Sequence, residues 1–182
     1  MPEVQICKTR GRQKQVSVPR VPGQVAMYTC GVTVYRYAHI GNMLTYLMSD
    51  FWTRALRYLG FEVRLIQNIT DVGHLENDIQ GTGEDRMMIA VQAEGKSPEE
   101  ISDFYNRAFL EDADLLRIER AQQYPKATEF IDEMIQLVQS LEKLGLTYEV
   151  EGNVYYDVVK RGDYPKLSNN TLDQLQAGIR ID

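Results

Sequence analysis

The chain has little cysteine and no long hydrophobic run. Two of its 182 residues are cysteine, Cys7 and Cys30, which excludes a disulfide framework and indicates a reducing compartment. No apolar run approaches the roughly 18 residues that a membrane span requires. The polar, basic start of the chain lacks the apolar segment of a signal peptide. We therefore expect a cytoplasmic protein that does not associate with membranes.

Basic residues are too few for general nucleic-acid binding. The chain carries 20 Lys and Arg against 26 Asp and Glu, a formal net charge of −6. Affinity for nucleic acids that is independent of sequence comes from phosphate contacts by surplus basic side chains. A nucleic-acid partner would therefore need a local patch or another domain. The composition is otherwise that of a globular protein, and the length allows one domain, with or without a small insertion.

The order of apolar patterns predicts an α/β fold that opens with a βαβ unit. Residues 1–23 form a polar lead-in arm with short strands. A run rich in β-branched residues predicts a buried strand over 27–34, helical spacing predicts a helix over 41–59, and a second strand follows over 61–67. Such a succession forms a right-handed crossover between parallel strands. We expect residues 24–96 to hold this unit and a following loop.

Helices dominate the rest of the chain, residues 97–182. Ser97 and Glu100 match a capping box around Pro98, so a helix should begin there. A third helix is predicted over 128–144 and a hairpin strand near 154–158. Apolar side chains of all three helices should face the core. In the helix over 41–59 these side chains are Leu44, Leu47, Met48, Phe51, Ala55, Leu56 and Leu59.

The segment that joins the first predicted strand to its helix carries the most chemistry. It reads CGVTVYRYAHIGN from Cys30 to Asn42. The free N–H groups of a helix N-terminus bind phosphate well. His39 could donate to phosphate oxygens, and Gly41 lacks the Cβ that would keep a flat purine away. Taken alone, the pattern hints at nucleotide binding, and the alternatives are a packing role for His39 and a buried hydrophobic role for Cys30.

This segment resembles the cysteinyl-tRNA synthetases, class I ligases whose first strand and helix carry a Cys-Gly-x-Thr-Val-Tyr run followed by the ATP-binding HIGH signature. The likeness continues in LRYLGFEVRLIQNITDV (Leu56–Val72) and LDQLQAGIRID (Leu172–Asp182). It implies the first half of a Rossmann-type, HUP-like parallel sheet with added helices and a small β element. Residues 97–182 would then hold those helices and the start of the family's inserted region.

The resemblance also implies a reaction and its cofactors. Cysteine would attack the α-phosphate of ATP to give cysteinyl-adenylate and pyrophosphate, and the aminoacyl group would then pass to tRNA(Cys). Zn²⁺ would select L-cysteine over serine, because a soft thiolate binds zinc far better than an alcohol does. By position, the implied roles are zinc ligand for Cys30, amino-acid pocket for Gly31 and Thr70, ATP binding for His39, Gly41 and Asn42, and catalysis for His39 and Asn42.

The chain departs from the family pattern at several positions. Asn42 stands where the signature ends in His, Arg36 stands where Asp is common, and Val72-Gly73-His74 replaces an acidic run. We interpret His74 as a loop histidine rather than a ligand. The family's other zinc ligands and its KMSKS loop lie beyond the matched region. Residues 1–182 alone are therefore expected to bind zinc poorly and to be inactive.

Two other functions stay open at this point. A ligase that joins activated cysteine to an amino sugar, of the mycothiol type, shares the fold and the use of zinc. The chain could instead be a catalytically inactive, nucleotide-binding paralogue, since half of the active-site motifs are missing from it. The sequence leaves the oligomeric state open, with a monomer as the expectation.

Overall fold

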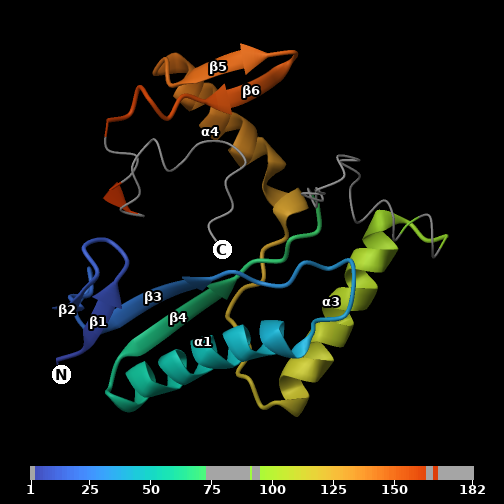
Figure 1. Ribbon diagram of the computed structural model, residues 1–182. Coiled ribbons are helices and arrows are strands. Elements are labelled where there is room, and N and C mark those ends of the chain that lie inside the picture. The colour runs from blue at the N-terminus through green and yellow to red at the C-terminus, as the bar shows by residue number, and fades with distance from the viewer. Residues whose placement is uncertain (1–2, 73–90, 92–94, 163–165, 168–182) are drawn as a thin grey trace. The chain divides into compact units, whose positions relative to one another are not determined.

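A computed structural model describes residues 3–72, 91, 95–162, 166 and 167 (Figure 1). By its internal contacts the chain divides into two units, Pro19–Ile131 and a second unit made of Pro2–Val18 and Asp132–Asp182. The predicted loop over 73–96 lies almost entirely outside the described residues, as do the final predicted helical turn over 172–177 and the second matched phrase. No helix in the described part of the chain is long and apolar enough to cross a membrane.

The first unit is built on two parallel strands joined by a helix. Strand β3 (Gln24–Thr29) pairs in parallel with β4 (Glu62–Gln67), with Gln24 opposite Glu62 at one end and Thr29 opposite Gln67 at the other. Helix α1 (Ile40–Tyr58) connects them and lies along the pair (Figure 1). The predicted order of strand, helix and parallel strand is confirmed, although β3 covers Gln24–Thr29 instead of the predicted 27–34.

A further extended segment, residues 122–126, runs beside β4 on the edge that does not pair with β3. The Gln67 amide donates to the Gln123 carbonyl at 3.1 Å, and the Ile69 amide donates to the Pro125 carbonyl at 2.8 Å. The bridges that these bonds form are parallel, so the segment adds a third parallel run to the pair β3 and β4. Because it continues into the 3₁₀ turn Ala127–Phe130, it anchors that turn to the sheet.

Helix α3 (Pro98–Leu115) closes the core of the first unit. Its predicted capping box is present: the Glu100 amide donates to Ser97 Oγ at 3.2 Å, and the Ser97 amide donates to Glu100 Oε2 at 2.8 Å. The cap fixes where the helix begins, and its buried face then meets α1 and the segments after β3 and β4. The resulting cluster consists of Val32, Val34, Met43, Tyr46, Ile69, Ile101, Phe109 and Ala113.

The buried face of α1 is not the predicted one. The residues that face inward are Met43, Tyr46, Asp50, Thr53 and Leu56. Of the residues that apolar spacing selected, only Leu56 is buried, and Leu44 is 60% exposed. Thr53 can be buried because its hydroxyl donates to the Ser49 carbonyl at 2.9 Å. Two polar residues on the inner face therefore made the apolar stripe point to the wrong side.

Asp50 ties α1 to the chain that follows α3. Arg54 Nε donates to Asp50 Oδ2 at 2.7 Å, and the Glu119 amide donates to Asp50 Oδ1 at 3.0 Å. Arg54 Nη2 also donates to the Arg117 carbonyl at 2.7 Å. Both carboxylate oxygens are thus occupied, which is what burial of a charged group requires.

The second unit contains two hairpins and a helix. Strands β1 (Gln5–Lys8) and β2 (Gln13–Val16) pair antiparallel, as do β5 (Thr147–Val150) and β6 (Asn153–Tyr156). The rings of Tyr148 and Tyr155 stack across the second hairpin with centroids 5.5 Å apart. Helix α4 (Ile131–Lys143) confirms the third predicted helix, but none of its side chains is buried, because the described part of this unit offers only short two-stranded sheets to cover it.

Beyond β3, the chain approaches the end of β4 very closely at Gly31. A Cβ added to Gly31 would lie 1.5 Å from the Asn68 carbonyl oxygen and 3.1 Å from Gln67 Cγ. Only a residue without a side chain fits there. The predicted strand over 27–34 consequently ends as β3 at Thr29, and the chain rejoins the sheet through a single bridge between Thr33 and Thr70.

Replacing Asp50 should destabilise the first unit. We expect Asp50→Ala to lower the free energy of unfolding by about 2–3 kcal/mol, because a partly buried amide and an arginine both lose their acceptor. Asp50→Asn, which keeps one acceptor, should cost about 1 kcal/mol. Urea unfolding measures both, with Glu111→Gln on an exposed surface as the control. Equal stability of Asp50→Ala and the control would contradict the role assigned to Asp50.

Adding one methyl group at Gly31 should be far more harmful than its size suggests. Gly31→Ala forces the loop away from β4, and we expect a loss of about 3 kcal/mol in the free energy of unfolding. Gly162→Ala is the matched control, because nothing lies within 4 Å of its added Cβ. The two variants can be compared in one denaturant titration. A Gly31→Ala protein as stable as Gly162→Ala would show that the close approach is absent.

Candidate functional site

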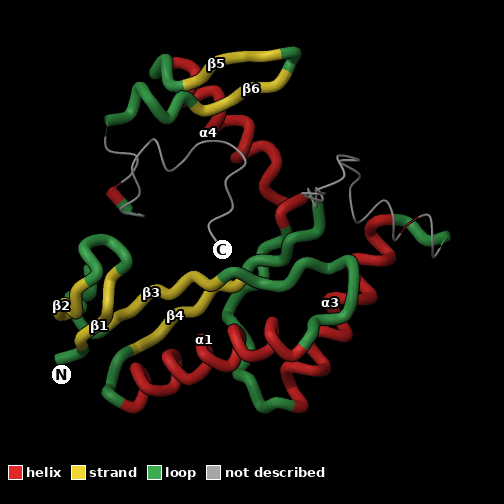
Figure 2. Tube along the Cα trace, in the orientation of Figure 1, coloured by secondary structure: helices red, strands yellow, loops and turns green. Residues whose placement is uncertain are grey.

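The candidate site lies where β3 and β4 end, at the same edge of the sheet. Figure 2 shows the loop that leaves β3 at this edge. Parallel pairing continues past both strands: the Thr70 amide donates to the Val32 carbonyl at 3.0 Å, and the Val34 amide donates to the Thr70 carbonyl at 3.2 Å. The carboxyl ends of parallel strands are where α/β proteins bind ligands. The two segments that carry the predicted site residues are therefore held side by side.

Asn68 joins two of the predicted residues through its side chain. Its Oδ1 accepts from the Gly31 amide at 3.0 Å, and its Nδ2 donates to Thr70 Oγ1 at 3.1 Å. Gly31 and Thr70, both expected at the amino-acid pocket, are thus brought together. Because Thr70 Oγ1 accepts this bond, its own hydroxyl proton remains available to a ligand. Asn68 was missed by the sequence reasoning, although an amide directly after a buried strand was a usable signal.

His39 is the N-cap residue of α1. Its Nδ1 accepts from the Gly41 amide at 3.1 Å and from the Asn42 amide at 3.4 Å. Asn42 Oδ1 returns the bond by accepting from the His39 amide at 3.1 Å, which completes a capping box. A ring nitrogen that accepts carries no proton, so the neutral ring holds its proton on Nε2. The exposed His39 ring therefore still offers one N–H donor to a ligand.

The packing of the His39 ring explains why position 41 is a glycine. A Cβ at this position would lie 3.0 Å from His39 Cε1 and 3.1 Å from His39 Nδ1. The absence of a side chain thus gives the capping ring its place over the first turn. The expected role in admitting a purine stays a prediction.

A small cavity separates the loop after β3 from α1. It has a volume of about 110 Å³, and its lining includes Gly31, Thr33, Arg36, Asn42 and Tyr46. The guanidinium of Arg36 lies 5.2 Å from the centroid of the Tyr35 ring. Arg36 and Asn42, two of the positions that depart from the pattern implied by the resemblance, thus contribute to one cavity.

Tyr46 is held almost completely out of water beneath this cavity. It is 5% exposed, and its ring meets Phe109 edge-on with centroids 5.0 Å apart. Burial raises the pKa of the Tyr46 hydroxyl to about 12, and a smaller electrostatic contribution comes from Cys30. The hydroxyl is consequently protonated near neutral pH and can donate a hydrogen bond.

Cys30 is exposed at the end of β3, so it is not the buried hydrophobic residue of the alternative reading. Cys7 is also exposed and belongs to the other unit. Within the described ranges no three His, Cys, Asp or Glu residues gather in a way that could hold a metal ion. His74 lies outside the described residues. Cys30 can therefore supply one ligand to zinc, and the described residues do not by themselves complete a zinc site.

Asp71 follows Thr70 in the chain, but its carboxylate has a structural role. Its Oδ1 accepts from the Thr128 amide at 3.1 Å, and its Oδ2 accepts from the Thr128 hydroxyl at 2.6 Å. The carboxylate thereby fixes the 3₁₀ turn that precedes α4. This use of both oxygens separates Asp71 from the ligand-facing group formed by Gly31, Thr70 and His39.

Comparison with known proteins gives consistent relatives. Residues 16–182 match the family described as tRNA synthetases class I (C) catalytic domain. Cysteine–tRNA ligase from Treponema denticola is 45% identical over 174 residues, which cover 96% of this chain and 35% of the relative. The cysteine–tRNA ligases of Chlorobium luteolum and Chlorobium chlorochromatii are 46% and 44% identical over 177 residues, covering 97% of this chain and 36% and 37% of the relatives.

The chain thus spans about a third of the length of the curated relatives that it matches. The family match takes in the loop after β3, helix α1, strand β4 and the helices that follow. Over this length the chain has the fold of a class I tRNA synthetase catalytic domain. The chain therefore belongs to the tRNA synthetases class I (C) catalytic domain family.

Proposed function

We propose that the chain is the N-terminal part of the catalytic domain of a cysteine–tRNA ligase. The observation that carries the proposal is the 44–46% identity to cysteine–tRNA ligases over nearly the whole chain. The Asn68 bridge supports it, because it holds Gly31 and Thr70 together beside the helix that His39 caps. Residues 24–96 would form the βαβ nucleotide-binding unit and its loop, following the lead-in arm over 1–23, and residues 97–182 the helices and the start of the inserted region. The parallel pair β3 and β4 would open a Rossmann-type sheet.

In this proposal ATP binds at the start of α1. The helix has 19 residues, and its N-terminus attracts anions because the peptide dipoles align. His39 Nε2 and Asn42 Nδ2 are the donors that the capping box leaves free. Attack of the cysteine carboxylate on the α-phosphate releases pyrophosphate, and negative charge shifts to the leaving group. His39, Gly41 and Asn42 would bind and orient the phosphates, so that catalysis consists of placement and charge stabilisation.

The amino acid would lie between the ends of β3 and β4. The Thr70 hydroxyl can donate a hydrogen bond to the amino acid. Because Gly31 has no side chain, the loop after β3 packs closely against Asn68, which would leave room for the amino acid. Cys30 would be one thiolate ligand of a zinc ion whose other ligands lie outside the described residues. Bound zinc would supply selectivity for the substrate thiol over a hydroxyl.

The proposed partners follow from the reaction. The enzyme would take L-cysteine, ATP and tRNA(Cys), act in the cytoplasm and work as a monomer. A net charge of −6 makes this chain a poor surface for tRNA, so most tRNA contacts are assigned to other parts of the enzyme.

Separating the two tasks of His39 tests its place in the site. His39→Asn keeps a good N-cap but loses the Nε2 donor, so stability should change little while ATP–pyrophosphate exchange falls about 100-fold. His39→Ala loses the cap as well and should unfold about 1 kcal/mol more easily. Exchange rates and urea unfolding of both variants give the answer. Full exchange activity in His39→Asn would remove His39 from ATP binding.

The reaction itself is tested in two stages. A protein of the relatives' length that contains residues 1–182 should show cysteine-dependent ATP–pyrophosphate exchange and should transfer labelled cysteine to tRNA(Cys). In a parallel reaction, the same enzyme is given cysteine, ATP and an amino sugar in place of tRNA. Residues 1–182 alone should exchange no pyrophosphate above background. Transfer to the amino sugar but not to tRNA would overturn tRNA as the proposed acceptor. Robust pyrophosphate exchange by residues 1–182 would overturn the proposal that this part of the enzyme is inactive alone.

A further inference from the structure

The charges of this acidic chain are unevenly distributed along it. Glu3 is the only acidic residue before Asp50, and all other acidic residues lie from Asp50 onward. Six basic residues precede Asp50, namely Lys8, Arg10, Arg12, Lys14, Arg20 and Arg36. The net charge of −6 is therefore an average over a positive start and a negative remainder. A positive segment of this kind attracts anions locally, whatever the sign of the whole chain.

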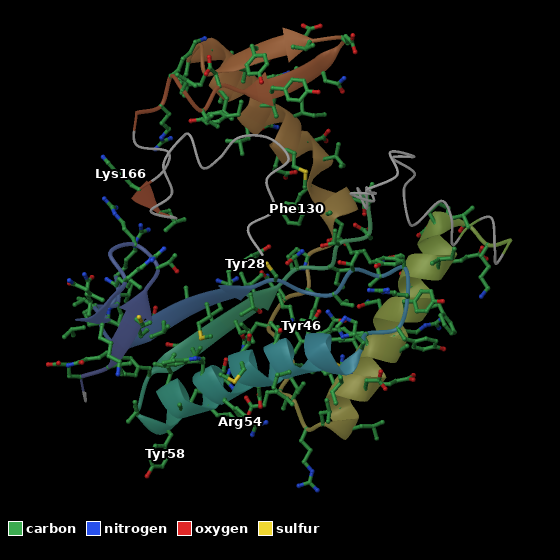
Figure 3. The ribbon with its side chains drawn as sticks, in the orientation of Figure 1. Tyr28, Tyr46, Arg54, Tyr58, Phe130 and Lys166 are labelled. Carbon is green, nitrogen blue, oxygen red and sulfur yellow. The ribbon has the colours of Figure 1, made fainter. Side chains whose placement is uncertain are left out.

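Four of these basic residues lie on one exposed hairpin. Lys8 ends β1, Lys14 lies in β2, and Arg10 and Arg12 belong to the turn between the two strands. Gly11 and Arg12 have positive φ angles, 83° and 48°, so the turn is tight and keeps the two arginines close together. All four basic side chains are exposed, and nitrogen-tipped side chains surround this hairpin in Figure 3. The hairpin therefore presents a dense positive charge to solvent.

A hollow in the same unit continues this positive surface. It has a volume of about 530 Å³, and its lining includes Arg10 of the hairpin turn, Arg161 and Lys166, which Figure 3 labels. No carboxylate is among the described residues that line it. The rest of this lining is apolar or aromatic and consists of Leu137, Leu141, Tyr156 and Leu167. Cations beside apolar side chains fit a ligand that joins a phosphate to a flat ring, as a nucleotide does.

We propose that the β1–β2 hairpin and this hollow form a surface that binds RNA, with Arg10 and Arg12 in contact with backbone phosphates. Phosphate contacts of basic side chains supply affinity that does not depend on base sequence. RNA fits better than an acidic peptide, because the apolar side chains of the hollow can pack on an unstacked base.

This surface is separate from the candidate site. Its residues belong to the second unit, whereas Gly31, His39 and Thr70 belong to the first. That the RNA is a tRNA rests on the proposed function. The binding of RNA itself rests on the charge of the hairpin and the lining of the hollow.

The binding test uses a protein of the relatives' length that contains this chain, and its probe is a fluorescently labelled tRNA(Cys) transcript. The double variant Arg10→Gln, Arg12→Gln should bind about tenfold more weakly at about 100 mM KCl. The slope of log affinity against log salt should fall by about 1–2, since fewer counterions are released. Arg10→Lys with Arg12→Lys keeps both charges and should restore most of the affinity. Fluorescence anisotropy over a salt series measures these changes.

A matched control changes the net charge by the same amount elsewhere. Arg107→Gln with Arg117→Gln removes two exposed cations from the first unit and should leave the affinity and the salt slope as in wild type. Lys166→Gln tests the hollow, and we expect a loss of about threefold. Equal affinity and salt slope in the Arg10, Arg12 glutamine variant and in the control would overturn the proposal. Binding of anionic phospholipid vesicles that depends on Arg10 and Arg12, with no effect on RNA, would overturn RNA as the partner.

Pyrophosphate exchange separates this proposal from the proposed function. Exchange needs no tRNA, so the Arg10, Arg12 glutamine variant should exchange at the wild-type rate, which also shows that it is folded. If the wild-type protein lacks cysteine-dependent exchange but the variant still loses RNA affinity, the proposed function fails and the RNA surface stands. If exchange is present and the variant binds RNA as wild type does, the RNA surface fails and the proposed function stands.

Discussion

The contact between Gly31 and Asn68 is the constraint on which the candidate site depends. Because Gly31 has no side chain, the Asn68 carbonyl can lie where a Cβ would otherwise be, and the Asn68 side chain can reach both the Gly31 amide and Thr70. This contact fixes how closely the loop that follows β3 approaches the end of β4. Cys30, directly before Gly31, is exposed at the end of β3. A single missing methyl group therefore positions groups 37 residues apart in the chain.

The spacing of the signature follows from helix capping as much as from ligand binding. His39 at the N-cap and Asn42 three residues later satisfy each other's backbone amides, and Gly41 gives the His39 ring its place. One nitrogen of the ring is used by the fold, and the other is left for a ligand. Because the two tasks fall on separate ring nitrogens, the backbone amides and a ligand do not compete for one atom.

Local patterns in the sequence were sufficient for the framework of the first unit and insufficient for its inner surfaces. The β-branched run, the helical spacing and the Ser97 capping box predict β3, α1 and α3, because each depends on neighbouring residues. The buried face of α1 could not be predicted, since burial of Asp50 is permitted by an amide 69 residues away at Glu119. Tyr46 was missed for the same reason, because it is buried by Phe109 of another helix, whereas Asn68 stands directly after a buried strand and could have been found from that position.

The two departures from the signature are better understood together than apart. Asn42 in place of His removes at most one positive charge from the start of α1, whereas Arg36 in place of Asp removes a negative charge and adds a positive one. Both residues line the same cavity, so the changes act on one small volume. The net result is a more positive entrance to the helix than the usual pattern provides. Taken together, the two differences from the pattern that the resemblance implies therefore add positive charge near the start of α1 rather than remove it.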